Sequence, residues 1–106
     1  MTLDEWLRTR APEAPPALAD GLRAALGDAL ARDASEASDL CLAAAERALR
    51  AYLPRCAAGT DEALELLTVD ALVTYAFEAG AEDLEGFDRR ARAAMQRIAT
   101  LAAEAA

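Results

Sequence analysis

Apolar side chains recur three and four positions apart along most of this chain, the spacing that places them on one face of an α-helix. The stretches that show this spacing are separated by segments with Pro, Gly, Thr or Asp, which are typical of helix ends. We therefore predict four main helices, over residues of about 16–32, 34–54, 61–79 and 83–104.

A shorter helix is predicted at the start of the chain, over residues 2–10. Thr2 and Glu5 form the T-x-x-E pattern of a capping box there, in which each side chain binds a backbone amide of the first turn. The next residues, 11–16, hold three prolines, and this predicts a rigid, extended connector. Because a helix of two turns is not stable alone, we expect Trp6 to hold it against the rest of the fold.

The fold class predicted from this pattern is all-α. Thirty of the 106 residues are alanine, the best helix former, and short connections favour antiparallel neighbours. The expected architecture is a single domain over residues 1–106, an antiparallel four-helix-type bundle with the additional short N-terminal helix packed across it. Within this bundle the helix over 83–104 has the cleanest apolar stripe, formed by Leu84, Phe87, Ala91, Ala94, Met95, Ile98, Leu101 and Ala102.

The helix over 61–79 breaks the pattern of a surface helix, because its large apolar residues point around its whole circumference. A helix of this kind is either central in its own fold or covered by another chain. One side can satisfy the core of a single copy, and it is formed by Leu64, Leu72, Tyr75 and Ala79. Gly80 follows and predicts the end of the helix.

A second side of the same helix is the candidate interface or pocket, formed by Leu66, Asp70, Val73, Thr74 and Phe77. We predict that this side lies at or near the twofold interface of a homodimer, because Leu66, Val73 and Phe77 are too apolar to remain solvent-exposed together. In the competing arrangement, the N-terminal helix covers this side through Trp6 and Leu7 and seals a monomer.

Asp70 lies in the middle of this side and allows two interpretations. In the functional one, the carboxylate is held in an apolar pocket and serves proton transfer or ligand binding. In the simpler one, which we prefer, it is paired with an arginine or belongs to a narrow polar edge of the helix with Thr74 and Glu78.

The polar composition argues against an enzyme. The chain has no His and no Lys, and all eleven basic residues are arginine, so it lacks the usual general base and any Schiff-base lysine. No cofactor and no metal are expected, since the Glu-x-x-His motif of metal-binding bundles cannot occur without His. Cys56, which follows Arg55, is a weak candidate for a reactive thiol, and Cys41 is expected to be a small buried side chain.

Charge and termini indicate where such a chain would work. A net charge of −8 disfavours binding to nucleic acid or to an anionic membrane. The sequence MTLDEWLRTR has acids where a signal peptide has its apolar region, and no apolar stretch reaches the length of a membrane span. Two cysteines without a disulfide framework, and an Ala- and Arg-rich composition, favour a reducing bacterial-type cytoplasm.

Three hypotheses for function are compatible with the sequence. The preferred one is a non-enzymatic interaction or structural module that binds itself or another protein through part of the helix 61–79. The alternative is a bundle that binds a small molecule in a pocket beside that helix. A weaker alternative, based on net charge alone, is an acidic inhibitor or mimic that binds a basic protein partner.

Overall fold

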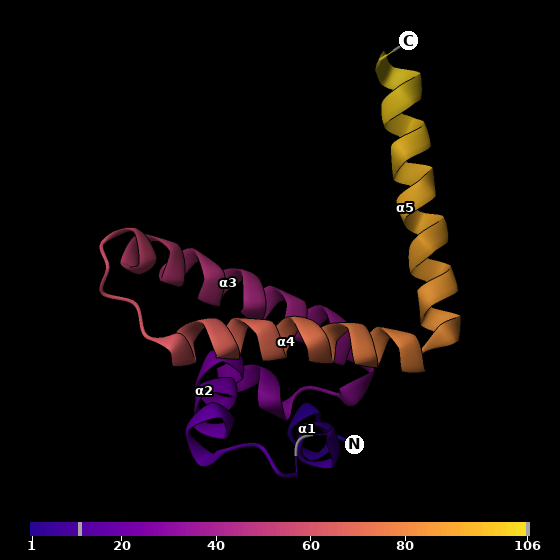
Figure 1. The fold of residues 1–106 in the computed structure, drawn as a ribbon. Helices are drawn as coiled ribbons and strands as arrows, with labels where there is room; N and C mark the ends of the chain where they lie inside the picture. Colours follow the sequence, from indigo (N-terminus) through magenta and orange to yellow (C-terminus); the bar gives the residue numbers. More distant parts are fainter. Residues whose placement is uncertain (11, 106) are drawn as a thin grey trace.

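The computed structural model describes residues 1–10 and 12–105, so Ala11, the first residue of the predicted connector over 11–16, lies outside the described residues. Five α-helices follow one another along the chain (Figure 1), and no strand occurs among the described residues. The all-α class is therefore confirmed. The helices are α1 (Leu3–Arg10), α2 (Pro16–Leu26), α3 (Ala37–Ala57), α4 (Ala63–Glu82) and α5 (Leu84–Ala105), with 3₁₀ turns at Gly27–Ala31 and Ala34–Glu36.

The helices α3 and α4 form an antiparallel hairpin that is the centre of the body (Figure 1). The chain leaves α3 through Gly59, whose φ of +72° is in the left-handed region, where glycine has no steric penalty. It enters α4 through a capping box in which the side chains of Glu62 and Glu65 each accept a backbone amide of the other residue. Both ends of the turn are thus fixed by local chemistry, and α4 must run back along α3.

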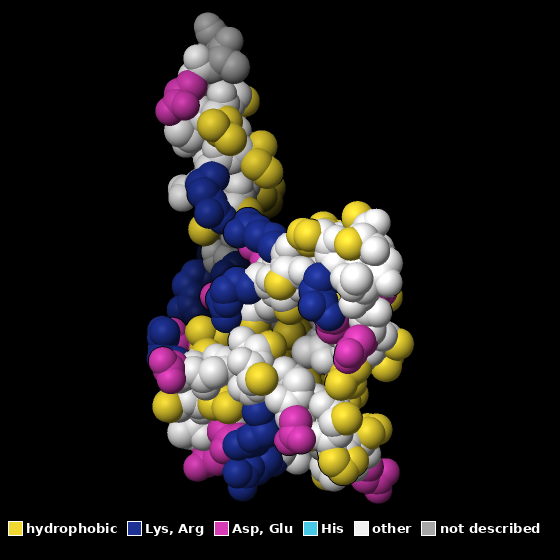
Figure 2. Space-filling view, turned by 90° about the vertical axis from the view of Figure 1, so that its left-hand side faces the viewer, with side chains coloured by type: hydrophobic (Ala, Val, Ile, Leu, Met, Phe, Trp, Pro, Cys, Tyr) yellow, Lys and Arg dark blue, Asp and Glu magenta, His cyan; other side chains and the backbone are white. Residues whose placement is uncertain are grey.

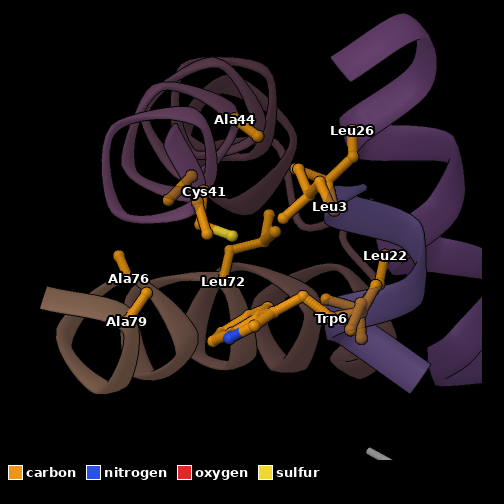
Figure 3. Close-up of a cluster of buried hydrophobic side chains, with 12 residues drawn as sticks. Leu3, Trp6, Leu22, Leu26, Cys41, Ala44, Leu72, Ala76 and Ala79 are labelled. Atoms are coloured by element: carbon orange, nitrogen blue, oxygen red, sulfur yellow. The ribbon is translucent and has the colours of Figure 1, made fainter. Parts of the chain in front are cut away.

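The core of the body is built from few large and many small side chains (Figure 3). Leu72 of α4 and Cys41 of α3 are fully buried at its centre. Around them lie the alanines of the two helices, which allow their backbones to approach closely: Ala37, Ala44, Ala45, Ala76 and Ala79. Leu22 and Leu26 of α2 complete the core next to Leu3 and Trp6 of α1.

Backbone hydrogen bonds and side-chain packing both hold the short helix α1 against the body. The amide of Leu3 donates to the carbonyl of Arg32 at 2.8 Å, and the amide of Ala34 donates to the carbonyl of Met1 at 2.9 Å. Trp6 is buried and meets the ring of Tyr75 edge to face, with 6.4 Å between ring centroids. The Thr2–Glu5 capping box predicted from the sequence is present.

Several helix boundaries differ from the predicted ones, among them those of α3, which was predicted over 34–54 and spans Ala37–Ala57. The helix predicted over 16–32 ends at Leu26, because Gly27 has a φ of +51° that an α-helix does not allow, and the chain continues as a 3₁₀ turn. The helix predicted over 61–79 does not stop at Gly80 but continues to Glu82. Gly80 is a position of close packing instead, where an added Cβ would lie 3.4 Å from the Oγ of Ser38.

The arrangement of the last helix is the main departure from the predicted bundle. The antiparallel packing predicted for four helices is seen for α3 and α4, whereas α5 leaves the body and projects from it (Figure 1). Only Asp83 connects α4 to α5, and an antiparallel helix pair needs a connection of two to five residues. The amide of Gly86 donates to the Asp83 carboxylate and the amide of Phe87 to its carbonyl, both at 2.8 Å, so Asp83 starts α5 in a new direction.

Across residues 1–10 and 12–105, no helix has both the length and the apolar character needed to cross a membrane.

Candidate functional site

The apolar side of α5 is exposed, and we call it the α5 stripe. It is formed by the side chains predicted from the sequence to form one face, and Figure 2 shows them as a yellow edge along the projecting helix. The five large ones have most of their surface in water: Leu84 75%, Phe87 59%, Met95 70%, Ile98 66% and Leu101 64% exposed. In ordinary amphipathic helices such residues face a core, so the α5 stripe lacks a partner within the described part of the chain.

The predicted candidate side of α4 lies mostly at the surface. Phe77 is 72% exposed and Leu66 is 48% exposed. Val73 is half-buried against the core. Trp6 and Leu7 of α1 are buried in the body, and Trp6 meets Tyr75 rather than Phe77. The N-terminal helix therefore does not cover Phe77.

The polar residues of the same side form the wet edge of the helix. Asp70 and Thr74 are exposed, and the Thr74 hydroxyl donates to the Asp70 carbonyl oxygen at 2.9 Å. The carboxylate of Asp70 is thus in water rather than in an apolar pocket, as the simpler interpretation expects.

The junction of α1, α4 and α5 carries a cluster of charges. Glu82 accepts the indole N–H of Trp6 at 3.3 Å and pairs with Arg10. Arg90 of α5 lies 3.8 Å from the Asp83 carboxylate. These contacts border a polar cleft of about 490 Å³ whose lining includes Ser35, Ser38 and Arg89. Glu82 thus joins α1 to the end of α4, and Arg90 lies beside the residue that connects α4 to α5.

The two cysteines have opposite surroundings. Cys41 is fully buried, and burial raises the pKa of its thiol to about 11. Cys56 is exposed near the end of α3, close to Tyr52, whose pKa is raised by a hydrogen bond with Cys56 and by another with Asp61 at 3.0 Å.

Arg55, the cation next to Cys56 in the sequence, is engaged elsewhere. It pairs with Glu65 at 2.9 Å and donates to the carbonyl of Thr60 at 3.0 Å. Arg55 therefore ties the end of α3 to the start of α4.

A metal site and a small-molecule pocket are the two other kinds of site that α4 could offer. In the described portion of the chain, no group of three or more Cys, Asp or Glu side chains is placed to hold a metal ion. A shallow hollow of about 290 Å³ lies beside α4, with Gly21, Ala48, Leu64 and Thr68 in its lining. The candidate residues Leu66, Asp70, Val73, Thr74 and Phe77 do not line this hollow.

No family model matches this chain, and no curated protein or solved structure is significantly similar to it.

The sequence identified every residue of the α5 stripe but placed the helix inside the bundle. The feature that separates the two cases is the length of the connection before α5, which is the single residue Asp83 and is too short for an antiparallel return.

Proposed function

We propose that this chain is a non-enzymatic interaction module that self-associates, with the exposed α5 stripe as its main contact surface. The observation that carries the proposal is that five large apolar side chains of one helix are each more than half exposed on one projecting element. Contiguous apolar surfaces of this kind mark sites of protein–protein contact.

The shape of the molecule supports an intermolecular contact. Asp83 alone separates α4 from α5, and its carboxylate starts α5 away from the body. The stripe is therefore kept at a distance from the body that precedes it. A second copy of the chain presents the same apolar surface, and a symmetric dimer forms when such a surface packs against its own copy.

The composition supports an interaction role rather than a chemical one. The chain has no His or Lys to supply a base or a Schiff base. Its buried thiol has a raised pKa, and a protonated thiol is a poor nucleophile. We place the module in a reducing cytoplasm, where its two free cysteines stay reduced.

Light scattering of the purified chain at micromolar concentration tests self-association. We expect a mass of twice 11.2 kDa. Ile98→Glu should return the mass to that of one chain, because a carboxylate in the middle of an apolar contact would lose its water. Ile98 is 66% exposed, so the same change leaves the fold of the single copy intact.

The matched control is Gln96→Glu, which adds the same charge at an exposed position of α5 outside the stripe. It should remain a dimer. A monomer for the unchanged chain contradicts self-association. A dimer that survives Ile98→Glu but is lost on Phe77→Glu would move the contact to the outer side of α4.

A further inference from the structure

The spacing of the α5 stripe shows what kind of partner it fits. Six of its positions follow steps of three, four, three, four and three residues, and they are Leu84, Phe87, Ala91, Ala94, Ile98 and Leu101, with Met95 and Ala102 beside them. This heptad pattern is the seam along which two α-helices pack side by side, with side chains of one helix between those of the other. The occupant indicated by the spacing is therefore a single helix of similar length.

The sizes of these side chains select a direction for that helix. Two alanines, Ala91 and Ala94, are followed by the two large residues Ile98 and Leu101. If a second copy of α5 runs antiparallel about a twofold axis near Gln96, Ala94 faces Ile98 of the second copy and Ala91 faces Leu101 of the second copy. Each layer then joins one small and one large side chain, which fills space evenly.

The other arrangements fill this space poorly. In a parallel, in-register pair, each alanine would face the same alanine, and Ile98 would face Ile98. The layers at Ala91 and Ala94 would then be underfilled, and underfilled layers cost stability. An antiparallel pair moved by one heptad would place Phe87 against Ile98 and leave Ala91 against Ala94, which combines an overfilled layer with an empty one.

The charges beside the stripe favour this alignment over the one moved by a heptad toward α4. Arg90, Arg97 and Glu104 follow at intervals of seven residues and so share one flank of α5. In the antiparallel alignment about Gln96, Arg90 lies beside Glu104 of the second copy, and the twofold axis repeats this pair. The alignment moved by one heptad would instead bring Arg90 beside Arg97. In the favoured alignment Arg97 meets its own symmetry mate, but both are exposed, and water weakens that repulsion.

We propose that α5 pairs antiparallel with α5 of a second copy about an axis near Gln96, with Ala94 packed on Ile98, Ala91 on Leu101 and Arg90 paired with Glu104 across the interface. This inference rests on the proposed self-association and adds its direction and register. The fold leaves room for it, because each body is attached at the first residue of its α5. Two antiparallel helices therefore carry their bodies at opposite ends of the pair.

Charge reversal tests the direction and the register together. In the homodimer of Arg90→Glu, each of the two symmetry-related pairs joins two acidic side chains. In the homodimer of Glu104→Arg, each pair joins two arginines. We expect each variant alone to dimerise about tenfold more weakly than the unchanged chain, since exposed ion pairs are individually weak but here change sign twice. The dissociation constants are measured by sedimentation equilibrium in low salt.

Mixing the two variants supplies the decisive result. A heterodimer of Arg90→Glu with Glu104→Arg regains both opposite-charge pairs, so the mixture should dimerise about as tightly as the unchanged chain. The control is Arg89→Glu, which reverses a charge away from this flank. Mixing it with Glu104→Arg should not restore the dissociation constant of the unchanged chain.

The outcomes separate the two proposals. If the unchanged chain dimerises but the mixture of Arg90→Glu and Glu104→Arg shows no recovery, the antiparallel register is wrong and self-association stands. If the unchanged chain is monomeric at all concentrations tested, self-association is wrong and the antiparallel pair falls with it.

Discussion

At the scale of single residues, the two thiols show how one residue type takes two roles in this fold. Cys41 is a core side chain with no surface in water, whereas Cys56 is exposed. Burial raises the pKa of Cys41 to about 11, because the apolar core disfavours the thiolate. Cys41 should therefore react far more slowly than Cys56, because its thiol is out of reach of solvent and its thiolate is disfavoured.

We predict that an aromatic disulfide reagent at pH 8 modifies one thiol per folded chain and two per chain in denaturant. Cys56→Ala should abolish the reaction of the folded protein, and Cys41→Ala should leave it unchanged. The released chromophore measures both. Two rapidly reacting thiols in the folded chain would show that the core around Cys41 opens readily.

A second prediction at this scale concerns the ion pair that joins α1 to α2. Asp4 Oδ1 lies 2.6 Å from Arg23 Nη1, and the hydrogen bond with Arg23 lowers the pKa of Asp4 below its ordinary value of 3.8. A carboxyl group whose pKa is lowered by folding stabilises the folded state above its unfolded pKa. That contribution is lost as the pH falls through the folded value.

Asp4→Asn should therefore destabilise the protein at pH 7, and the difference from the unchanged chain should shrink at pH 3. Urea unfolding at the two pH values measures it. The control is Asp88→Asn, which breaks the exposed pair with Arg92 at 3.1 Å and should have little effect at either pH. An equal loss at pH 7 and pH 3 would contradict the role of the Asp4 charge.

Residue chemistry also shows the limit of the sequence. The Thr2–Glu5 capping box could be predicted because both partners lie within one turn. The environment of Asp70 could not, because sequence spacing places it among apolar neighbours along the helix but does not show which side faces water. Arg55 was expected beside Cys56, yet it pairs with Glu65, ten residues away, because the turn after α3 brings them together.

At the scale of elements, five helices were predicted at nearly their observed positions, and the helix that was misplaced is α5. Its stripe is equally suited to the inside of a bundle and to a contact between chains, so periodicity alone could not decide. The deciding feature is the connection at Asp83, which is too short for an antiparallel return. The short connection was not foreseen from the sequence, because the prediction that Gly80 ends α4 placed a longer connection before α5.

This arrangement predicts that the body does not depend on α5. A chain that ends at Asp83 should unfold with a free energy within about 1 kcal/mol of that of the monomeric full chain, because surface changes away from the core have small effects. Removal of residues 1–10 should cost several times more, because Leu3, Trp6 and Leu7 are buried there. Circular dichroism during urea unfolding measures both. A large loss in the shorter chain would mean that α5 contributes to the core.

At the scale of the whole molecule, the projecting helix gives the single copy an extended shape. The radius of gyration of the Cα atoms is 16.2 Å, whereas a globular chain of this length has about 13 Å. A bundle with α5 folded onto the body, as the sequence pattern alone suggested, would have the smaller value.

Small-angle X-ray scattering of the monomeric variant Ile98→Glu can therefore separate the two shapes. We expect a radius of gyration of at least 16 Å, in keeping with the open form. A value of about 13 Å would show that α5 folds back onto the body once its stripe is unable to pair. Gln96→Glu, expected to stay dimeric, should give a larger radius than either.

Because α5 is long and is attached only at Asp83, a small rotation at this bend produces a large displacement at the far end of the helix. With 22 residues and a rise of about 1.5 Å per residue, the helix is about 33 Å long. A turn of about 10° at Asp83 therefore moves its far end by about 6 Å. The polar cleft with Ser38, Arg89 and Arg90 lies at this bend. In the proposed pair of helices, a small change in the cleft would therefore produce a large change in the distance between the two bodies.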